Sequence, residues 1–326
     1  MPLVPSYIKK LKNYRPGKPI SEASRETGIK DIIKLASNEN PLGASPKAIQ
    51  AIKDSLENIH RYPDASGYEL RKKLADRFKV KVDNVVLGAG SEGIMSTIMR
   101  TFLLSDDELV SAENSFIGFR VLANASGKRI HWVPMKKYRY DLEMMATKIT
   151  DYTKIIYIAN PDNPMGTYVT RKEFDQFYQY VPERVLIILD EAYFEFADEI
   201  DDYPDSMTYR YDNVITLRSF SKAYGLGGIR IGYGLAHDEL ISNLLKVKVP
   251  FEPSFTAQVA GIAALDDPDF LLKTIKANKQ GMKFFKQELN ICLLYTSDAD
   301  DEEDSEELAG RRIIKKKKGG GGGGGG

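Results

Sequence analysis

The chain has 326 residues, of which 46 are basic, 46 are acidic and 42% are hydrophobic. The even charge balance argues against nucleic-acid and membrane partners, and no apolar run is long enough to span a bilayer. One cysteine, Cys292, excludes an internal disulfide and a cysteine-based metal cluster. The composition is ordinary for a cytoplasmic globular protein with room for two domains or one large α/β unit.

Strand-like and helix-like segments alternate along the chain up to about residue 290. Residues 45–59 predict a helix with Ser45 as its N-cap and Pro46 at its first position. Residues 66–78 predict a second helix, which a capping box between Ser66 and Glu69 would open. The stretch 84–103 has the pattern of a short apolar strand, a glycine turn and a helix.

The second half of the chain continues this alternation. Apolar runs within 154–166, 184–196, 213–225 and 229–236 predict four more strands. A capping box between Thr170 and Glu173 predicts a helix between the first two of them. Strands that are apolar on both faces and alternate with helices favour an α/β fold, with a mostly parallel sheet covered by helices on both faces.

Ligands of such sheets bind beyond the carboxyl ends of the strands. Four loops follow predicted strands there: 88–92, 160–166, 190–193 and 219–222. The first lies in "GAGSEG", whose backbone N–H groups at a helix N-terminus favour an anion such as phosphate. This glycine spacing fits neither a dinucleotide site nor a P-loop, and a plain packing turn is the alternative.

The next two loops offer an amide and a carboxylate. Asn163 in "NPDNPMG" could donate and accept hydrogen bonds at the strand edge, although this stretch is also an ordinary turn sequence. Asp190 ends an apolar strand, and no acidic or histidine cluster recurs nearby to suggest a metal. A lone carboxylate in a partly dry site suits a fixed cation such as a protonated pyridine nitrogen, and Tyr193 could donate to a phenolate.

The fourth loop, in "SFSKAYGLGGIRIGYG", holds one lysine with no acidic neighbour in that stretch. A solvated lysine is one reading, and an amine that forms a Schiff base is the other. Lys222 on an aldehyde, Asp190 on a pyridinium, Tyr193 on a ring oxygen, and Ser219 and Arg230 on a phosphate together describe pyridoxal 5′-phosphate.

The chain also resembles the fold type I, class II pyridoxal-phosphate aminotransferases over residues 1 to about 290, and more narrowly the histidinol-phosphate aminotransferases. The stretches that carry this resemblance are "LASNENPLGASP", "RYPD", "LGAGSEGI", "NPDNPMGT", "LDEAYFEFA" and "RSFSKAYGLGGIRIGY". The resemblance implies that Lys222 binds the cofactor and shuttles a proton, and that Asp190 holds the pyridine nitrogen. It places Asn163 and Tyr193 on the ring hydroxyl oxygen.

The same resemblance implies further site residues. The cofactor phosphate would bind Ser219, Arg230 and the amides of Ala89, Gly90 and Ser91, while Phe116 would stack on the cofactor where the family usually has tyrosine. Tyr62 would reach the phosphate of a neighbouring subunit, which implies a homodimer. Asn38 and Asn40 would lie in the loop on the substrate side.

The implied reaction is a two-stage transamination in histidine biosynthesis. Glutamate would donate its amino group, and imidazole-acetol phosphate would accept it to give histidinol phosphate. Three alternatives stay open: an aromatic amino-acid aminotransferase, a phosphothreonine decarboxylase, and, for the literal chain, a cofactor-binding fragment without catalysis. We expect weak or no activity from the chain as written, because the family's substrate-binding arginines of the small domain are absent.

The last residues differ in composition from the rest. "SDADDEEDSEEL" is acidic, "RRIIKKKK" is basic, and eight glycines follow, as in disordered or interaction tails. The stretch that starts at Cys292 resembles a translated sequencing adapter. We therefore expect an N-terminal arm over 1–35, a large cofactor domain over 36–250, a partial small domain over 251–292, and a disordered, artefactual tail over 293–326.

Overall fold

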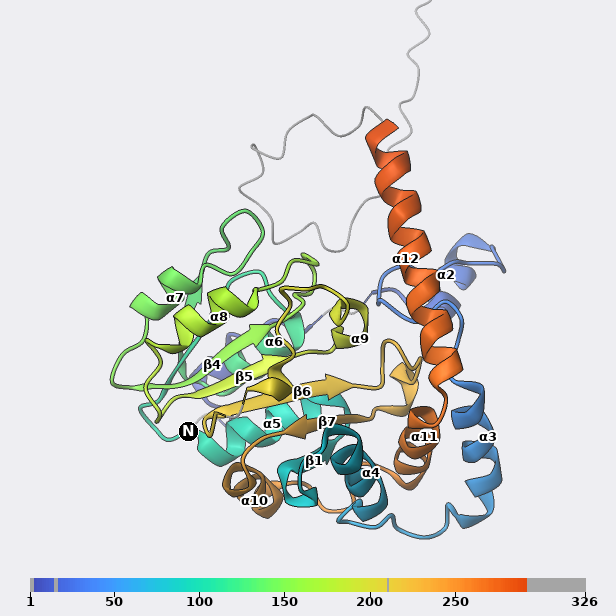
Figure 1. Ribbon diagram of the computed structural model, residues 1–326, viewed down its shortest axis with the longest axis horizontal. Coiled ribbons are helices and arrows are strands. Elements are labelled where there is room, and N and C mark those ends of the chain that lie inside the picture. The colour runs from blue at the N-terminus through green and yellow to red at the C-terminus, as the bar shows by residue number, and fades with distance from the viewer. Residues whose placement is uncertain (1–2, 15–16, 210, 292–326) are drawn as a thin grey trace, which may run out of the picture. The chain divides into compact units, whose positions relative to one another are not determined.

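The computed structural model describes residues 3–14, 17–209 and 211–291 (Figure 1). These residues form two compact units. The described residues of Met1–Tyr14 and Asn38–Lys279 make up the first, and those of Arg15–Ser37 and Gln280–Gly326 make up the second. The expected tail over 293–326, together with Cys292, lies outside the described residues, and the expected domain division stays a prediction. No helix in the described part combines the length and apolarity that a bilayer crossing needs.

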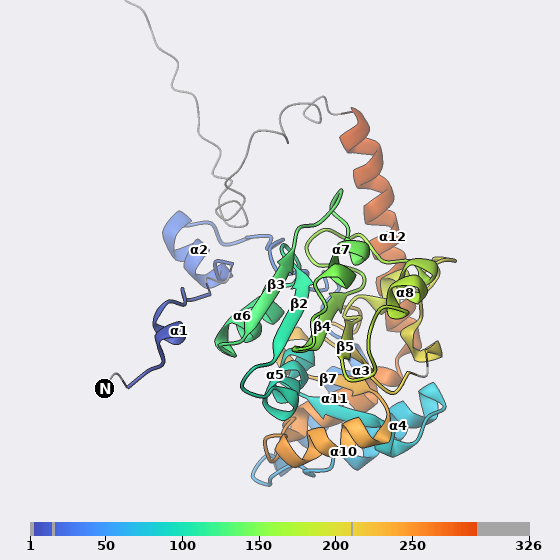
Figure 2. The same ribbon diagram turned by 90° about the vertical axis from the view of Figure 1, so that its left-hand side faces the viewer.

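A seven-stranded sheet forms the centre of the first unit. Its strands are β1 (Val85–Gly88), β2 (Glu108–Ala112), β3 (Arg129–Val133), β4 (Thr153–Ala159), β5 (Leu186–Asp190), β6 (Val214–Ser219) and β7 (Gly232–Leu235). They lie in the order β1-β7-β6-β5-β4-β2-β3, and Figure 2 shows β3, β2, β4 and β5 side by side. Only β7 runs antiparallel to its neighbours, so the mostly parallel sheet is confirmed.

The helices and short 3₁₀ segments connect these strands or flank them. They are α1 (Ser6–Lys9), α2 (Ile20–Thr27), α3 (Pro46–Ser55), η1 (Leu56–Asn58), α4 (Tyr68–Phe78), η2 (Val82–Asn84), α5 (Gly90–Phe102), α6 (Ile117–Ala125), α7 (Leu142–Thr147), α8 (Arg171–Tyr178), α9 (Phe194–Ala197), η3 (Ser206–Thr208), η4 (Gly227–Ile229), α10 (Asp238–Val247), α11 (Phe255–Leu265) and α12 (Pro268–Ile291).

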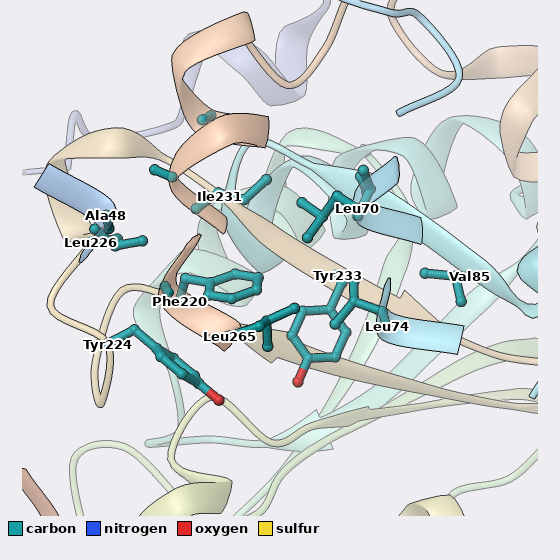
Figure 3. Packing of buried hydrophobic residues seen from close by; sticks show 14 of the residues in the cluster. Ala48, Leu70, Leu74, Val85, Phe220, Tyr224, Leu226, Ile231, Tyr233 and Leu265 are labelled. Carbon is teal, nitrogen blue, oxygen red and sulfur yellow. The ribbon is translucent and has the colours of Figure 1, made fainter. Parts of the chain in front are cut away.

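Three apolar clusters hold these layers together. One packs α5, α6 and α10 on a face of the sheet, through residues such as Ile98, Phe119 and Leu244. Another packs α7 and α8 on the opposite face. The third joins α3, α4 and α11 to β1, β7 and the chain after β6. Figure 3 shows this cluster, in which the ring of Phe220 lies between those of Tyr224 and Tyr233, with ring centroids 5.1 and 5.5 Å away.

Two of the three expected helix starts are confirmed. The Ser45 hydroxyl accepts from the N–H of Ala48 at the start of α3, and Thr170 and Glu173 form the reciprocal capping box of α8. The capping box expected between Ser66 and Glu69 is wrong.

The helix α4 starts one residue later than that expectation. The helix begins at Tyr68, after Gly67 in the left-handed region, and it has no side-chain cap from Ser66. The Asp64 carboxylate accepts from the N–H groups of Tyr68 and Ser66 at 3.0 and 2.9 Å. Asp64 therefore satisfies the amide of the first helical residue, Tyr68, in place of the Glu69 amide that a Ser66 capping box would reach.

Candidate functional site

The strand register brings the predicted loops to one edge of the sheet. Gly88 at the end of β1 and Ser219 at the end of β6 both pair with Gly232 at the start of β7. Ala159 at the end of β4 pairs with Asp190 at the end of β5. The loops 88–92, 160–166, 190–193 and 219–222 therefore leave the sheet on the same side, as expected from their sequence.

Asp190 is buried at this edge, with 3% of its surface exposed. Its Oδ2 accepts a hydrogen bond of 2.9 Å from the Tyr157 hydroxyl, whereas its Oδ1 is buried and has no hydrogen-bond partner in the described part of the chain. Burial raises the pKa of Asp190 to about 7, and the Tyr157 hydroxyl and the nearby Ala192 N–H oppose that rise. A buried, unsatisfied carboxylate oxygen is costly unless a donor or cation meets it.

Lys222 lies on a loop that buried apolar residues fix in place. Phe220, Ala223 and Tyr224 on either side of it are at most 2% exposed, and Figure 3 shows two of these rings packed in the cluster. The Lys222 ammonium lies 5.5 Å from the centre of the Tyr193 ring. Burial, and secondarily the positive charge of Arg230, lower the pKa of Lys222. Its amine consequently loses its proton more easily than a surface lysine does.

Tyr193 and Asn38 meet beside Lys222. The Asn38 side-chain amide donates to the Tyr193 hydroxyl at 3.0 Å. Burial raises the pKa of Tyr193, and the charges of Asp190 and Asp162 add to that rise. The tyrosine is therefore a neutral phenol that can still donate its own proton to an acceptor in the site.

Asn40 also contacts the lysine loop. Its side-chain amide donates to the carbonyl of Ala223 at 3.1 Å and to the Thr274 hydroxyl at 3.0 Å, while its carbonyl oxygen accepts from the N–H of Leu42. These contacts occupy its polar atoms with the chain itself. Its expected role on the substrate side stays a prediction.

The glycine loop and Arg230 lie against each other. A Cβ on Gly90, whose φ is +75°, would lie 2.6 Å from Arg230 Nη2, so only glycine leaves this space open. Arg230 donates to the carbonyl of Gly227 at 3.1 Å, and its Nη2 lies 3.3 Å from Glu92 Oε2. A half-exposed guanidinium thus lies beside the first turn of α5, where backbone N–H groups have no partner within the helix.

The other expected phosphate contacts differ in their surroundings. Ser91 and Ser219 are buried at this edge, and the Ser219 hydroxyl accepts from the N–H of Ser221 at 3.0 Å. The N–H of Ala89 donates to Glu252 Oε1 at 3.1 Å, so this chain's own carboxylate occupies it. The role of the Ala89 amide toward a phosphate stays a prediction.

The remaining expected residues lie around this group. Phe116 precedes α6, and a Cβ on Gly118 would lie 2.5 Å from its ring and 2.3 Å from Glu92. Asn163 lies half-buried in the loop after β4. Tyr62 instead lies on the surface, 80% exposed, with its ring stacked on Phe251 at 4.5 Å.

Two features of the site were missed from the sequence. Tyr157 lies in an apolar run where nothing marks it as a partner of Asp190; only the pairing of β4 with β5 shows that both face the same side. The salt bridge from Glu92 to Arg230 was missed too, although the acid stands inside the predicted glycine motif. Glu92 lies in the first turn of α5, next to the expected phosphate site. An acid at that place indicates a basic partner such as Arg230, and this signal was available in the sequence.

A cavity of about 470 Å³ lies at the opposite edge of the sheet. It is lined by residues that include Val214 at the start of β6, Leu235 at the end of β7, and His237. It contains none of the predicted site residues. The chemistry-bearing side chains therefore gather at the carboxyl edge.

Comparison with known proteins agrees with this geometry. A family model described as "Aminotransferase class I and II" matches residues 30–293. A histidinol-phosphate aminotransferase 2 from Hydrogenovibrio crunogenus is 44% identical over 283 residues, which are 86% of this chain and 76% of that protein. Its counterpart from Carboxydothermus hydrogenoformans is 40% identical over 289 residues, 88% of this chain and 80% of that protein.

Solved structures show the same fold. The histidinol-phosphate aminotransferase from Sinorhizobium meliloti, in complex with pyridoxal-5′-phosphate, matches with a TM-score of 0.77 at 30% identity, over 84% of this chain and 74% of that one. A mutant of Thermus thermophilus aspartate aminotransferase matches with a TM-score of 0.76 at 19% identity, which shows the fold alone. The described sheet and helices thus have the fold type I arrangement that the sequence resemblance implied.

Proposed function

Because the chain belongs to the class I and II aminotransferases, we propose that it transfers the amino group of glutamate to imidazole-acetol phosphate, with pyridoxal phosphate as its cofactor. The products are 2-oxoglutarate and histidinol phosphate. The names of the relatives that are 40% identical or more support this choice of substrate. The observation that carries the cofactor assignment is that the buried Oδ1 of Asp190 has no hydrogen-bond partner among the residues that the structure describes.

The residues at the carboxyl edge fit this cofactor. Asp190 Oδ1 offers a buried acceptor for the protonated ring nitrogen. Lys222 offers an amine of lowered pKa to the aldehyde. The space that Gly90 leaves open beside Arg230 suits the phosphate group. When bound, pyridoxal phosphate supplies an electron sink for the carbanion formed at the substrate Cα.

Each of these side chains has a separate role in the proposed reaction. Lys222, whose amine burial keeps readily deprotonated, would take the proton from the substrate Cα as general base and would deliver it as general acid to the cofactor carbon that had carried the aldehyde oxygen. Asp190 holds its negative charge against the ring nitrogen. Tyr193, oriented by Asn38, donates its phenol proton toward the ring oxygen, and Asn163 completes that contact.

We also propose that the enzyme is a homodimer that acts in the cytoplasm. Tyr62 and Phe251 form an exposed aromatic pair, and Ile49, Leu56 and Ile59 expose apolar surface along α3 and η1. A second copy that covered this surface would remove it from water and would bring Tyr62 to the partner's phosphate. The division into arm, cofactor domain and partial small domain belongs to the same proposal.

An amino-acceptor panel tests the substrate assignment. The purified chain, loaded with cofactor, is incubated with glutamate and either imidazole-acetol phosphate or phenylpyruvate, and 2-oxoglutarate is measured. Rates are compared within the same chain, so a low absolute rate does not obscure the ratio. We expect faster release with the phosphorylated acceptor, no release by Lys222→Ala, and an unchanged rate for Lys246→Ala, an exposed lysine on α10.

Two outcomes would contradict the substrate assignment. Faster release with phenylpyruvate would identify an aromatic aminotransferase. Carbon dioxide from phosphothreonine, in amounts that exceed keto-acid formation from glutamate, would identify a decarboxylase.

A further inference from the structure

We infer that Tyr157 is a positioning residue of this site, because its hydroxyl holds Oδ2 of Asp190 and so reserves Oδ1 for the ring nitrogen of the cofactor. The inference rests on the proposed function, since it concerns how Asp190 meets that cofactor. It assigns a role to a residue of β4 that nothing in the motifs marks as functional.

The pairing of β4 with β5 sets this contact. Ala159 lies opposite Asp190, so Tyr157 is the diagonal neighbour two residues back and points to the same face of the sheet. The Tyr157 hydroxyl donates to Asp190 Oδ2 at 2.9 Å. With Oδ2 occupied and the whole side chain buried, Oδ1 is the carboxylate oxygen that has no partner among the described residues.

The Tyr157 ring is itself fixed. It is fully buried and stacks on Phe119 of α6, with ring centroids 4.0 Å apart and planes 6° apart. The stack restricts the ring to one orientation, so the hydroxyl direction is set before any ligand arrives. Phe119 belongs to the helix that Phe116 precedes, and α6 thereby packs on the Asp190 side of the sheet.

The hydroxyl also favours the charged form of Asp190. Burial raises the pKa of Tyr157 well above that of a free phenol, so this group stays protonated and donates. Its hydrogen bond lowers the pKa of Asp190, against the larger effect of burial. Without the hydroxyl, the pKa of Asp190 would rise further. A smaller fraction of Asp190 would then be charged, and it would be a weaker counter-ion for a protonated ring nitrogen.

Binding measurements on three variants test this role. Tyr157→Phe removes the hydroxyl and keeps the ring, Asp190→Asn removes the charge, and the double variant combines them. Dissociation constants are measured for pyridoxal phosphate and for an analogue in which a carbon replaces the ring nitrogen. We expect Tyr157→Phe to weaken pyridoxal phosphate about tenfold, as for one hydrogen bond to a charged group, and to leave the analogue unchanged.

The double variant tests whether Tyr157 affects cofactor binding through Asp190. If Tyr157 acts only through Asp190, adding Tyr157→Phe to Asp190→Asn leaves the affinity for pyridoxal phosphate unchanged. Equal weakening of both ligands by Tyr157→Phe, or a further loss in the double variant, would overturn the inference. Ile98→Val, a change in the same apolar cluster, is the control for packing: it should lower the unfolding midpoint without changing the ratio of the two dissociation constants.

Failure of the inference and failure of the proposed function give different results. A wild-type chain without a visible absorption band that depends on Lys222 would contradict the proposed function. A wild-type chain with that band, whose Tyr157→Phe variant binds both ligands as the wild type does, would contradict only the role of Tyr157.

Discussion

Asp190 and Glu191 are adjacent carboxylates with opposite surroundings. Successive residues of a strand point to opposite faces of a sheet, and Asp190 accordingly meets Tyr157 while Glu191 accepts from Arg218 at 2.7 and 2.9 Å. Arg218 neutralises Glu191, whereas Oδ1 of Asp190 has no partner in the described part of the chain. Glu191 therefore stabilises the fold through its salt bridge, and Asp190 stays available for a cationic ligand.

The raised pKa of Asp190 predicts a pH-dependent stability of the cofactor-free chain. The folded pKa of about 7 exceeds the usual 3.8, so the folded state binds more protons between these values and stability falls as pH rises through this window. Asp190→Asn removes the effect. Between pH 5 and 7 we expect the wild type to lose about 2 kcal/mol relative to Asp190→Asn, measured by urea unfolding. Parallel stability curves for the two proteins would contradict this.

The salt bridge between Glu191 and Arg218 joins the ends of β5 and β6. Arg218 is 1% exposed, also contacts Asp205 at 2.8 Å, and lies 3.4 Å from the centre of the Phe194 ring. These two strand ends carry Asp190 and Ser219. The pair consequently sets the spacing between the pyridine-binding and phosphate-binding parts of the site.

Breaking this pair should be costly. Removing one partner leaves a buried charge uncompensated, so Glu191→Gln should lower the free energy of unfolding by about 3 kcal/mol. Asp76→Asn, which breaks the exposed pair with Lys72 on α4, should cost less than about 1 kcal/mol. Urea unfolding of both variants measures the difference. Similar losses would show that Glu191 contributes no more than a surface charge.

At the start of α4, the capping contact that forms differs from the one that the sequence pattern indicates. Asp64 accepts from Tyr68 and Ser66, while Ser66 caps nothing. Asp64→Ala should therefore destabilise the chain by about 1 kcal/mol, and Ser66→Ala by only a few tenths of that. Thermal unfolding of the two variants distinguishes them. A larger loss for Ser66→Ala would restore the capping box that the sequence pattern indicated.

The sequence predicts the type of sheet and the edge of the sheet that carries the site. Apolar runs indicate β1 and β4–β7, and the polar residues that follow them indicate the edge. The short strands β2 and β3 were missed, because Ser111 and His131 interrupt their apolar patterns. His131 instead pairs with Glu108 at the start of β2, at 2.7 Å. Contacts such as Tyr157 with Asp190 depend on strand order, which periodicity does not encode.

The exposed pair of Tyr62 and Phe251 predicts self-association. Sedimentation of the cofactor-loaded chain should give twice the monomer mass, and Tyr62→Asp should shift it toward monomer, because a charge would enter an apolar interface. Tyr180→Asp is a matched control, since Tyr180 is also exposed, at 69%. A wild-type monomer at micromolar concentration, or equal effects of the two variants, would contradict a dimer through this surface.

The absorption spectrum of the chain with pyridoxal phosphate, recorded before and after glutamate and beside Lys222→Ala, tests the cofactor and its lysine together. We expect a visible band that is absent in Lys222→Ala and that glutamate converts to the amino form of the cofactor. A folded wild-type chain with no such band, or a band that Lys222→Ala retains, would contradict the assignment of this edge of the sheet as a pyridoxal-phosphate site.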